Sequence, residues 1–511
     1  MTRAEPPVRP RLLVLAPLRI EARALSARAQ PGTVVLRTGA GPARATATAR
    51  KLAESPHPDA VVVAGVAGAL TADLRPGSVV VADRVIDQHG SQVVNLESAG
   101  LIAAALRRRS VPAVVGTVAT SDQIVQGRGR TDLAAKGAVA VDMESSALLG
   151  VPWSAATAVV RAIADTPGRE LRSLSTFSGG FKALAALRAA TPVLEEWAGA
   201  VGPRRVILAG PRSFCAGVER AIHTVEKAIE RYGTPVYVRR QIVHNRHVVE
   251  DLECRGAVFV QELEEVPDGA TVVFSAHGVS PQVRAQADSK SLQVVDATCP
   301  LVAKVHREVR RFHERGYQVV LIGHDGHDET EGTLGEADGI TLVEERSDID
   351  GLDVRDPEKI AYITQTTLSP DDVTEMVDAL SGRFPSVVGP SSADICYATQ
   401  NRQDAVRSIA GDCDLTLVIG SPNSSNTARL VEVAARAGCR AVMIDDETEI
   451  DLRWLTGVAT VGVTAGASAP PALVERVVSS LQGLAGPNRL EIEERSVRTE
   501  NVNFPLPLEV R

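Results

Sequence analysis

The sequence predicts a two-part α/β protein, with one α/β domain over residues 11–198 and a second over 204–484, followed by a charged tail at 485–511. Apolar runs typical of buried strands alternate with helical patterns along the whole chain, as in α/β folds. All six cysteines follow residue 214, so the two parts differ in composition. Between them, the segment 195–205 contains Gly and Pro and is followed by a new strand-like run.

The composition excludes several classes of protein. The 511 residues are 44% apolar and 23% charged, which is ordinary for globular proteins and excludes a mainly disordered, collagen-like or coiled-coil chain. With 55 basic against 63 acidic residues and 3% aromatic residues, a nucleic-acid partner is not expected. The first apolar run, LLVLAPL, has seven residues, which is too short for a membrane span and lacks the layout of a secretory signal. We therefore expect a cytoplasmic protein.

The first domain consists of apolar runs that each lead into a turn or a helix. The run at 11–18 precedes a helix that carries Glu21. The later segments lie at 33–54 (strand, Gly-rich turn, helix), 59–70 (strand), 113–125 (strand), 138–150 (strand joined to a helix through Glu144) and 156–168 (strand ending at Asp165). Their glycines match neither a Walker nor a dinucleotide motif and are interpreted as tight turns. What indicates a functional site is the combination of three acidic residues at three strand ends: Glu21, Glu144 and Asp165.

In the second domain, three cysteines share one sequence context. Cys215, Cys299 and Cys396 each follow a strand-like run and open a helix, at spacings of 84 and 97 residues. This predicts one α/β unit repeated three times with a cysteine at each tip, where open α/β sheets build their sites and helix N-termini favour thiolates. Three thiolates without a fourth ligand suit a cubane iron–sulfur cluster with one open iron. Cys254, Cys413 and Cys439 lie in or beside helical patterns and are interpreted as buried or half-buried structural thiols.

Polar clusters end six further apolar runs of this domain. Ser-Ser-Asn and Gly-Ala-Ser turns offer hydroxyls and backbone N–H groups to a phosphate, and His244, His277 and His327 can add donors around a diphosphate. Glu329 is the natural proton donor, since an enclosed carboxyl can stay protonated near neutrality. The segments are 241–249, 272–281, 319–335, 361–370, 417–430 and 461–471.

Residues 204–482 resemble the 4-hydroxy-3-methylbut-2-enyl diphosphate reductase family, because FCAGVERA, QIVHNR, FSAHGVS, DATCPLV, GHDGHDETEGT, TQTTLS, DICYATQNRQ, NSSNTARL and TAGASAPP occur in family order. The resemblance implies a trefoil of three α/β units around a 4Fe–4S cluster held by Cys215, Cys299 and Cys396, whose open iron takes the substrate's hydroxyl oxygen. It also implies reductive dehydroxylation to isopentenyl and dimethylallyl diphosphates, with electrons from a low-potential ferredoxin or flavodoxin. The residue roles that it implies are diphosphate binding by His244, His277, Ser424, Ser425, Asn426 and Ser468, a substrate-site role for His327, proton delivery by Glu329, and positioning of the hydroxyl end by Thr366.

The first domain resembles the purine nucleoside phosphorylase superfamily, in particular its methylthioadenosine/adenosylhomocysteine nucleosidase and hopanoid-associated branch. The resemblance implies that Glu21 activates water, Glu144 binds ribose hydroxyls and Asp165 protonates a purine leaving group. The family's purine loop reads TSDQIV here, and Ala164 replaces the serine before the acid.

Two hypotheses remain for this domain. Retention of Glu21, Glu144 and Asp165 favours cleavage of a purine N-glycosidic bond. Ile124 and Ala164 favour a non-catalytic binding or oligomerisation module on the same reductase. A redox sensor without catalysis is disfavoured by the intact Glu329 and diphosphate-binding set.

Overall fold

The computed structural model describes residues 11–54, 58–168, 175–487 and 489–511. The chain divides into two compact units. Unit 1 comprises Met1–Val206, Asp446–Thr460 and Glu475–Ile492, and unit 2 comprises Ile207–Asp445, Val461–Val474 and Glu493–Arg511. Unit 1 therefore includes two segments from late in the chain, beyond the range that the sequence predicts for the first domain. No helix among the described residues is long and apolar enough to cross a membrane.

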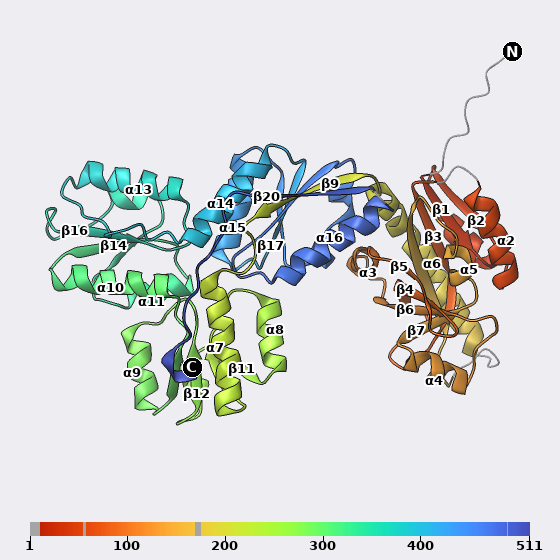
Figure 1. The fold of residues 1–511 in the computed structure, drawn as a ribbon, viewed down its shortest axis with the longest axis horizontal. Helices are drawn as coiled ribbons and strands as arrows, with labels where there is room; N and C mark the ends of the chain where they lie inside the picture. The colour runs from red at the N-terminus through yellow and green to blue at the C-terminus, as the bar shows by residue number, and fades with distance from the viewer. Residues whose placement is uncertain (1–10, 55–57, 169–174, 488) are drawn as a thin grey trace, which may run out of the picture. The chain divides into compact units, whose positions relative to one another are not determined.

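Unit 1 is built on one eight-stranded sheet in the order β2-β1-β3-β7-β6-β4-β5 (Figure 1). Strand β8 pairs with both β3 and β4, so β3, β7, β6, β4 and β8 form a closed ring. The strands are β1 (Leu12–Ala16), β2 (Thr33–Arg37), β3 (Ala60–Ala69), β4 (Val79–Asp87), β5 (Gln92–Asn95), β6 (Ala113–Thr120), β7 (Ala138–Asp142) and β8 (Ala156–Asp165). All five strands predicted by the apolar runs beyond the first are present, together with β4 and β5, which were not predicted.

The helices of unit 1 begin where the strands end. Glu21 lies in the first turn of α1, and Glu144 is the residue directly before α5. The helices are α1 (Arg19–Ser26), α2 (Pro42–Ala53), α3 (Ala99–Arg108), α4 (Arg128–Ala135), α5 (Ser145–Leu149) and α6 (Ser175–Ala200), with the short 3₁₀ turns Glu447–Glu449 and Leu452–Leu455. The main core packs Val, Leu and Ala side chains of β1, β3, β4 and β8.

Unit 2 contains three separate sheets, in the orders β11-β10-β12-β13, β15-β14-β16 and β18-β17-β19-β9-β20. The strands are β9 (Arg204–Gly210), β10 (Val236–Arg239), β11 (Ala257–Val260), β12 (Thr271–Phe274), β13 (Gln293–Asp296), β14 (Gln318–Ile322), β15 (Thr341–Val343), β16 (Ile360–Thr364), β17 (Leu415–Ile419), β18 (Ala441–Ile444), β19 (Thr460–Ala465) and β20 (Leu490–Ser496). The pairings within the first two sheets and among β17, β18 and β19 are parallel. The expected three α/β units are therefore confirmed as three sheets.

The helices of unit 2 include three that begin directly after the three predicted cysteines, namely α7, α10 and α14. The full set is α7 (Ala216–Tyr232), α8 (Arg246–Cys254), α9 (Pro281–Ser289), α10 (Pro300–Glu314), α11 (Asp328–Leu334), α12 (Arg346–Asp350), α13 (Pro370–Arg383), α14 (Tyr397–Ala410) and α15 (Ser425–Arg436), with 3₁₀ turns at Leu263–Glu265 and Leu508–Val510. Helix α16 (Pro471–Ala485) begins in unit 2, and its residues from Glu475 onward belong to unit 1.

Three local predictions are wrong. Cys396 does not follow a strand, because the irregular segment before it makes a single bridge, from Val388 to Ala361. The run before His244 is not a strand either: β10 ends at Arg239, and Ile242 and Val243 are buried in a bend. Cys254 is exposed rather than buried, since it occupies the last residue of α8.

The charged tail is structured. It contributes strand β20 to a sheet of unit 2, and Val510 near its end is buried in the core beside α7.

Candidate active sites

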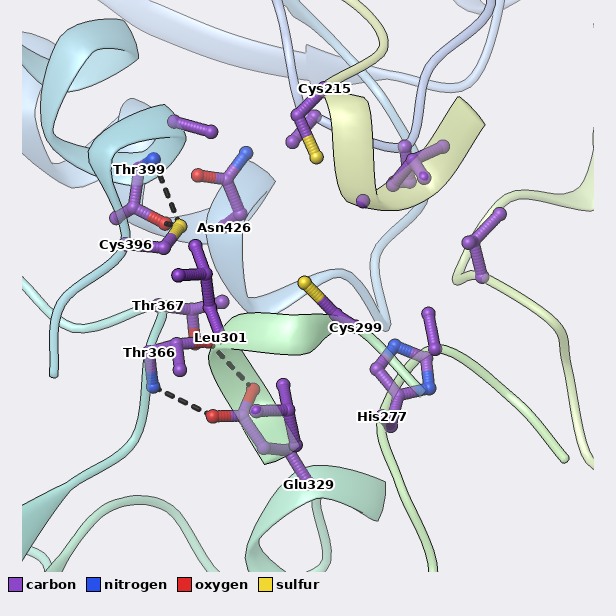
Figure 2. A pocket seen from close by; sticks show the side chains of 18 of the residues that line it. Cys215, His277, Cys299, Leu301, Glu329, Thr366, Thr367, Cys396, Thr399 and Asn426 are labelled. Atoms are coloured by element: carbon purple, nitrogen blue, oxygen red, sulfur yellow. Dashed lines mark hydrogen bonds between the residues drawn. The ribbon is translucent and has the colours of Figure 1, made fainter. Parts of the chain in front are cut away.

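Unit 2 contains an open cavity of about 770 Å³, into which all twelve candidate residues of this half project. The sulfur atoms of Cys215, Cys299 and Cys396 point toward the same space from three different helix starts (Figure 2). The remaining members lie around them: His244, His277, His327, Glu329, Thr366, Ser424, Ser425, Asn426 and Ser468.

Each cysteine backbone is hydrogen-bonded to a different polar loop of the same cavity. The N–H groups of Cys215, Cys299 and Cys396 donate to the carbonyls of Ala467 (3.2 Å), Ala276 (2.9 Å) and Thr366 (3.0 Å). The loops are those in which the sequence places Ser468, His277 and Thr366 itself. Thiols and polar loops are therefore joined by main-chain bonds, so each cysteine and its loop keep a fixed relative position.

The three thiols have the properties of a metal-binding set. Burial raises the pKa of Cys299 to about 12 and that of Cys396 to about 11, and the neighbouring thiol of Cys215 adds to both shifts. Bound metal cations would remove this penalty, because they stabilise thiolates. A Cβ atom on Gly217 would lie 2.8 Å from the Cys299 sulfur, so the space between the thiols requires glycine there. No fourth cysteine lines the cavity among the described residues, and the donor set fits a cluster with three protein ligands.

Glu329 and Thr366 form a closed pair at the cavity wall. The Thr366 N–H donates to Glu329 Oε1 at 2.7 Å, and its hydroxyl donates to Oε2 at 3.0 Å (Figure 2). Glu329 is 3% exposed. Burial raises the pKa of Glu329, while the two bonds from Thr366 oppose the shift. The pair can hold a proton next to the thiols.

The three histidines contact one another in the cavity. The rings of His244 and His277 stack with centroids 4.1 Å apart, and His327 meets both edge-on. Burial lowers the pKa of all three, that of His327 to about 4, and mutual repulsion adds to the shift of His277 and His327. His327 also caps α11, since its Nδ1 accepts the Glu329 N–H at 3.1 Å. A neutral histidine cluster of this kind gains charge when an anion enters.

The serine and asparagine turns line the cavity beside the histidines. Ser424 caps α15 by accepting the Thr427 N–H, and Ser468 donates to the carbonyl of His244 at 3.0 Å. Asn426 is buried, and both atoms of its amide lack a hydrogen-bond partner among the described residues. Unpaired buried amides are costly, so Asn426 is suited to a polar ligand group.

Unit 1 contains a second open cavity, lined by all three of its candidate carboxylates. Glu21 accepts the N–H groups of Leu18 (2.6 Å) and Val66 (2.8 Å), and Glu144 accepts that of Gly41 (2.9 Å). Burial is the largest effect on both glutamates and raises their pKa values, while Arg161 opposes it.

One residue in this cavity was missed by the sequence analysis. Arg130 on α4 forms a short, buried ion pair with Asp165 and donates to the carbonyls of Ala69 (2.8 Å) and Val125 (3.1 Å). Its sequence context, GRGRTDL, carries no motif that could have revealed the pairing.

Residues 206–482 match the sequence model of the LytB protein family, and residues 28–191 match that of the phosphorylase superfamily. The chain belongs to the LytB family. Its relatives include the 4-hydroxy-3-methylbut-2-enyl diphosphate reductase 2 of Mycobacterium bovis, 56% identical over 63% of this chain and 97% of the relative, and the reductase of Dechloromonas aromatica, 55% identical over 59% and 98%. The solved reductase of Plasmodium falciparum superposes with a TM-score of 0.57 at 38% identity, covering 60% of this chain and 97% of that one.

Two more residues, Asp328 next to the cavity histidines and Phe504 in the cavity lining, were not selected by the motif analysis. Asp328 lies 3.8 Å from both His244 and His277, and the three ligand atoms are close enough to hold a metal ion. Phe504, from the C-terminal tail, also lines the cavity. The Asp328 signal was available in GHDGHDETEGT, whereas Phe504 lies outside every motif.

Proposed function

We propose that the LytB half reduces (E)-4-hydroxy-3-methylbut-2-enyl diphosphate to isopentenyl and dimethylallyl diphosphates, using two electrons and two protons and releasing water. The observation that carries this proposal is the convergence of three thiols, a buried carboxyl and a neutral histidine cluster on one cavity. Cys215, Cys299 and Cys396 would hold a 4Fe–4S cluster, which supplies electrons and a Lewis-acid iron. A low-potential ferredoxin or flavodoxin would deliver those electrons.

The side chains of the cavity bind the substrate and supply protons. His244 and His277, with Ser424, Ser425, Asn426 and Ser468, bind the diphosphate, because hydroxyls, an unpaired amide and imidazoles suit an anionic group. The entering negative charge stabilises protonated imidazole, so binding takes up protons. His327 is part of the substrate site.

At the other end of the substrate, Glu329 in its acid form would carry the proton on Oε2 and donate it to the Thr366 hydroxyl oxygen, so that the hydrogen bond between the two groups is reversed. Thr366 lines the cavity and bonds to the Glu329 carboxyl through its Oγ1, and it orients the hydroxyl end of the substrate. Reduction of the C–O bond requires a proton for the departing oxygen, and this pair supplies it.

The test uses the full chain, loaded with iron and sulfide under anaerobic conditions, with the hydroxylated diphosphate and a chemical low-potential reductant. Wild-type protein and Cys254→Ser, which alters an exposed thiol outside the cavity, are expected to form both products. Cys299→Ser is expected to lose the cluster spectrum and turnover. Full spectrum and turnover in Cys299→Ser would reject the assignment.

We propose further that unit 1 cleaves a purine N-glycosidic bond. Glu21, with its pKa raised by burial, would activate water, and Glu144 would bind ribose hydroxyls. Asp165 would protonate the leaving base. The phosphorylase-superfamily match over residues 28–191 and the shared cavity of the three carboxylates support this role.

One observation favours the alternative, a non-catalytic binding or oligomerisation module. The ion pair with Arg130 stabilises the carboxylate of Asp165, whereas a proton donor must be the acid. In addition, Ile124 is exposed at the cavity where an aromatic wall would stack on a base.

The two are separated by incubating the full chain with methylthioadenosine, adenosylhomocysteine, inosine and an adenosylated hopane, with and without phosphate. The full chain is needed because unit 1 includes segments 446–460 and 475–492. Base release by wild type and by Asp132→Asn, an exposed aspartate of α4, but not by Asp165→Asn, would establish catalysis. If no base were released from any of these substrates, the result would favour the non-catalytic binding or oligomerisation module.

A further inference from the structure

We propose that Arg220, Lys304 and Arg402 form a cyclic set of backbone clasps that fixes the spacing of the three cysteines. We call them the cationic clasps. Each lies on the helix that begins after one cysteine, five or six residues further along, and each donates to the loop that precedes the next cysteine of the set. The inference rests on the proposed cluster at Cys215, Cys299 and Cys396.

The first clasp joins the Cys215 helix to the Cys299 loop. Arg220 lies on α7, and its Nη1 donates to the carbonyls of Ala297 and Thr298, both at 3.0 Å. These are the two residues directly before Cys299. The guanidinium therefore anchors the backbone from which the second thiol projects.

The second clasp joins the Cys299 helix to the Cys396 loop. Lys304 on α10 donates from Nζ to the carbonyls of Ser392 (2.7 Å) and Ala393 (3.0 Å) and to Asp394 Oδ1 (3.1 Å). Asp394 in turn accepts the Thr364 N–H at 3.1 Å. The irregular segment before Cys396, which lacks a strand to hold it, is thereby fixed to its neighbours.

The third clasp closes the cycle. Arg402 on α14 is fully buried and donates to the carbonyls of Ser213 (2.7 Å) and Phe214 (3.1 Å), the two residues before Cys215. Its Nη1 also donates to Ala398 at 3.0 Å, within the first turn of its own helix. One side chain thus joins the backbones beside Cys396 and Cys215.

The arrangement has a physical rationale. The three cysteine helices are associated with three different sheets, and strand pairing within a sheet cannot fix the distance between thiols that belong to different sheets. Charged donors to backbone carbonyls make strong, directional bonds, and here they are the connections that pass from one cysteine to the next. A cluster with only three protein ligands depends on that spacing, because ligand orientation by the surrounding bonds sets metal affinity.

The C-terminal tail reinforces two of the three clasps. Arg220 Nε donates to the carbonyl of Pro505 at 2.8 Å, and Arg402 forms an ion pair with Glu500 at 3.1 Å. Phe504, between these two anchors in sequence, lines the cluster cavity. The tail therefore belongs to the same bonding network as the cysteines.

The test removes one clasp at a time in the full chain: Arg220→Met, Lys304→Met and Arg402→Met. Matched controls alter exposed cations of the same three helices: Lys227→Met, Arg307→Met and Arg407→Met. The readouts are the electron paramagnetic resonance spectrum of the reduced protein and the rate of iron loss to a chelator, with circular dichroism to check folding.

Each clasp variant is expected to lose iron about tenfold faster or more, with an altered spectrum, while the controls match wild type. Lys304→Arg is expected to restore both properties, because a guanidinium can donate to the same carbonyls. Lys304 is partly exposed, so its variants stay informative if Arg402→Met does not fold.

Failure of wild type to hold a cluster would reject the proposed function. If the folded clasp variants retained iron as well as wild type does and gave the wild-type spectrum, the clasp proposal would be rejected and the proposed function would stand.

Discussion

Replacement of Glu329 by Gln is expected to remove proton delivery while keeping the structure of the site. The Thr366 N–H donates to Oε1, and the hydroxyl of the same residue bonds to Oε2. In Glu329→Gln the amide oxygen can accept the N–H bond, and the amide nitrogen can donate to the threonine hydroxyl. The two residues keep both contacts, and the side-chain volume hardly changes, so the melting temperature should stay within a degree or two of wild type.

The expected loss lies in the chemical step. Glutamine has no proton to transfer at neutral pH, and removal of a general acid lowers kcat by about 10²–10⁴-fold. This corresponds to about 3–5 kcal/mol in the activation barrier. Substrate binding should change little, because the proposed diphosphate site, which includes His244 and Asn426, is not altered.

The measurement is single-turnover product formation by the cluster-loaded full chain, beside the spectrum of the cluster. Thr366→Ser serves as the matched control, since it keeps the hydroxyl and the N–H, and it should retain activity within a few-fold. Thr366→Val should lose both activity and stability, because it leaves Oε2 buried without its donor, at a cost of about 1–3 kcal/mol. If Glu329→Gln turned over within threefold of wild type with an intact cluster, the proton-delivery argument would be refuted.

Three further predictions concern binding, pH and the second cavity. Asn426→Leu should weaken the binding of inorganic pyrophosphate, as measured by calorimetry. It should not lower the melting temperature, because the Asn426 amide has no protein partner among the described residues. An unchanged affinity for pyrophosphate would show that Asn426 is not part of the anion site. The pKa of His327 is about 4 in the folded protein against 6.5 for the free side chain, so the unfolded chain binds more protons between these two pH values. The free energy of unfolding therefore falls as the pH drops through this range, by about 2–3 kcal/mol at pH 4.5. In urea unfolding, His327→Asn, which keeps the helix cap, should show a shallower pH dependence of stability than wild type, and an identical pH dependence would contradict the lowered pKa. Arg130→Met should destabilise unit 1 by about 3–5 kcal/mol, because it removes the guanidinium that pairs with the buried Asp165 carboxylate. The double variant with Asp165→Asn should recover most of that loss. Equal losses in the single and double variants would show that the ion pair is not the cause.

The cavity of unit 2 could be predicted from the sequence because its residues occur in short, unusual motifs. A cysteine that opens a helix, or Ser-Ser-Asn after an apolar run, carries its chemistry within a few neighbouring residues. Twelve such residues were selected, and all twelve line one cavity.

The clasps could not be predicted, although Arg220 and Arg402 lie within the motifs FCAGVERA and DICYATQNRQ. Arg220, Lys304 and Arg402 are basic residues on amphipathic helices, where such residues usually face solvent. Their partners are backbone carbonyls 77 to 189 residues away in the chain, and a carbonyl has no sequence signature. The same limit explains why Glu329 was selected from its motif, whereas its two bonds to Thr366 were not foreseen.

The structure of the C-terminal tail was not predicted, because the sequence analysis described residues 485–511 only by their charge. Residues 485–511 are rich in charge, which favours a solvated segment, yet Glu500 bonds to a buried arginine and Val510 enters the core. Charged residues that alternate with apolar ones along an edge strand produce the same average composition as a loose tail. The pairing of β20 with β9 shows that residues 490–496 form an edge strand and not a loose tail.

The surroundings of the buried carboxyl favour the acid form in one cavity and the carboxylate in the other. This difference bears on the function of unit 1. Among the described residues, the two hydrogen bonds to the Glu329 carboxyl come from the uncharged Thr366, and burial favours the acid form of Glu329. Asp165 is as deeply buried but is paired with Arg130, which favours the carboxylate. A proton donor in unit 1 therefore requires either that Arg130 withdraws when a nucleoside enters or that the leaving base takes its proton from water. A module that only binds its ligand needs neither, because a carboxylate beside a guanidinium can accept the N–H groups of a base without any transfer. The fate of the Arg130–Asp165 pair on ligand binding thus decides between the two functions of this unit.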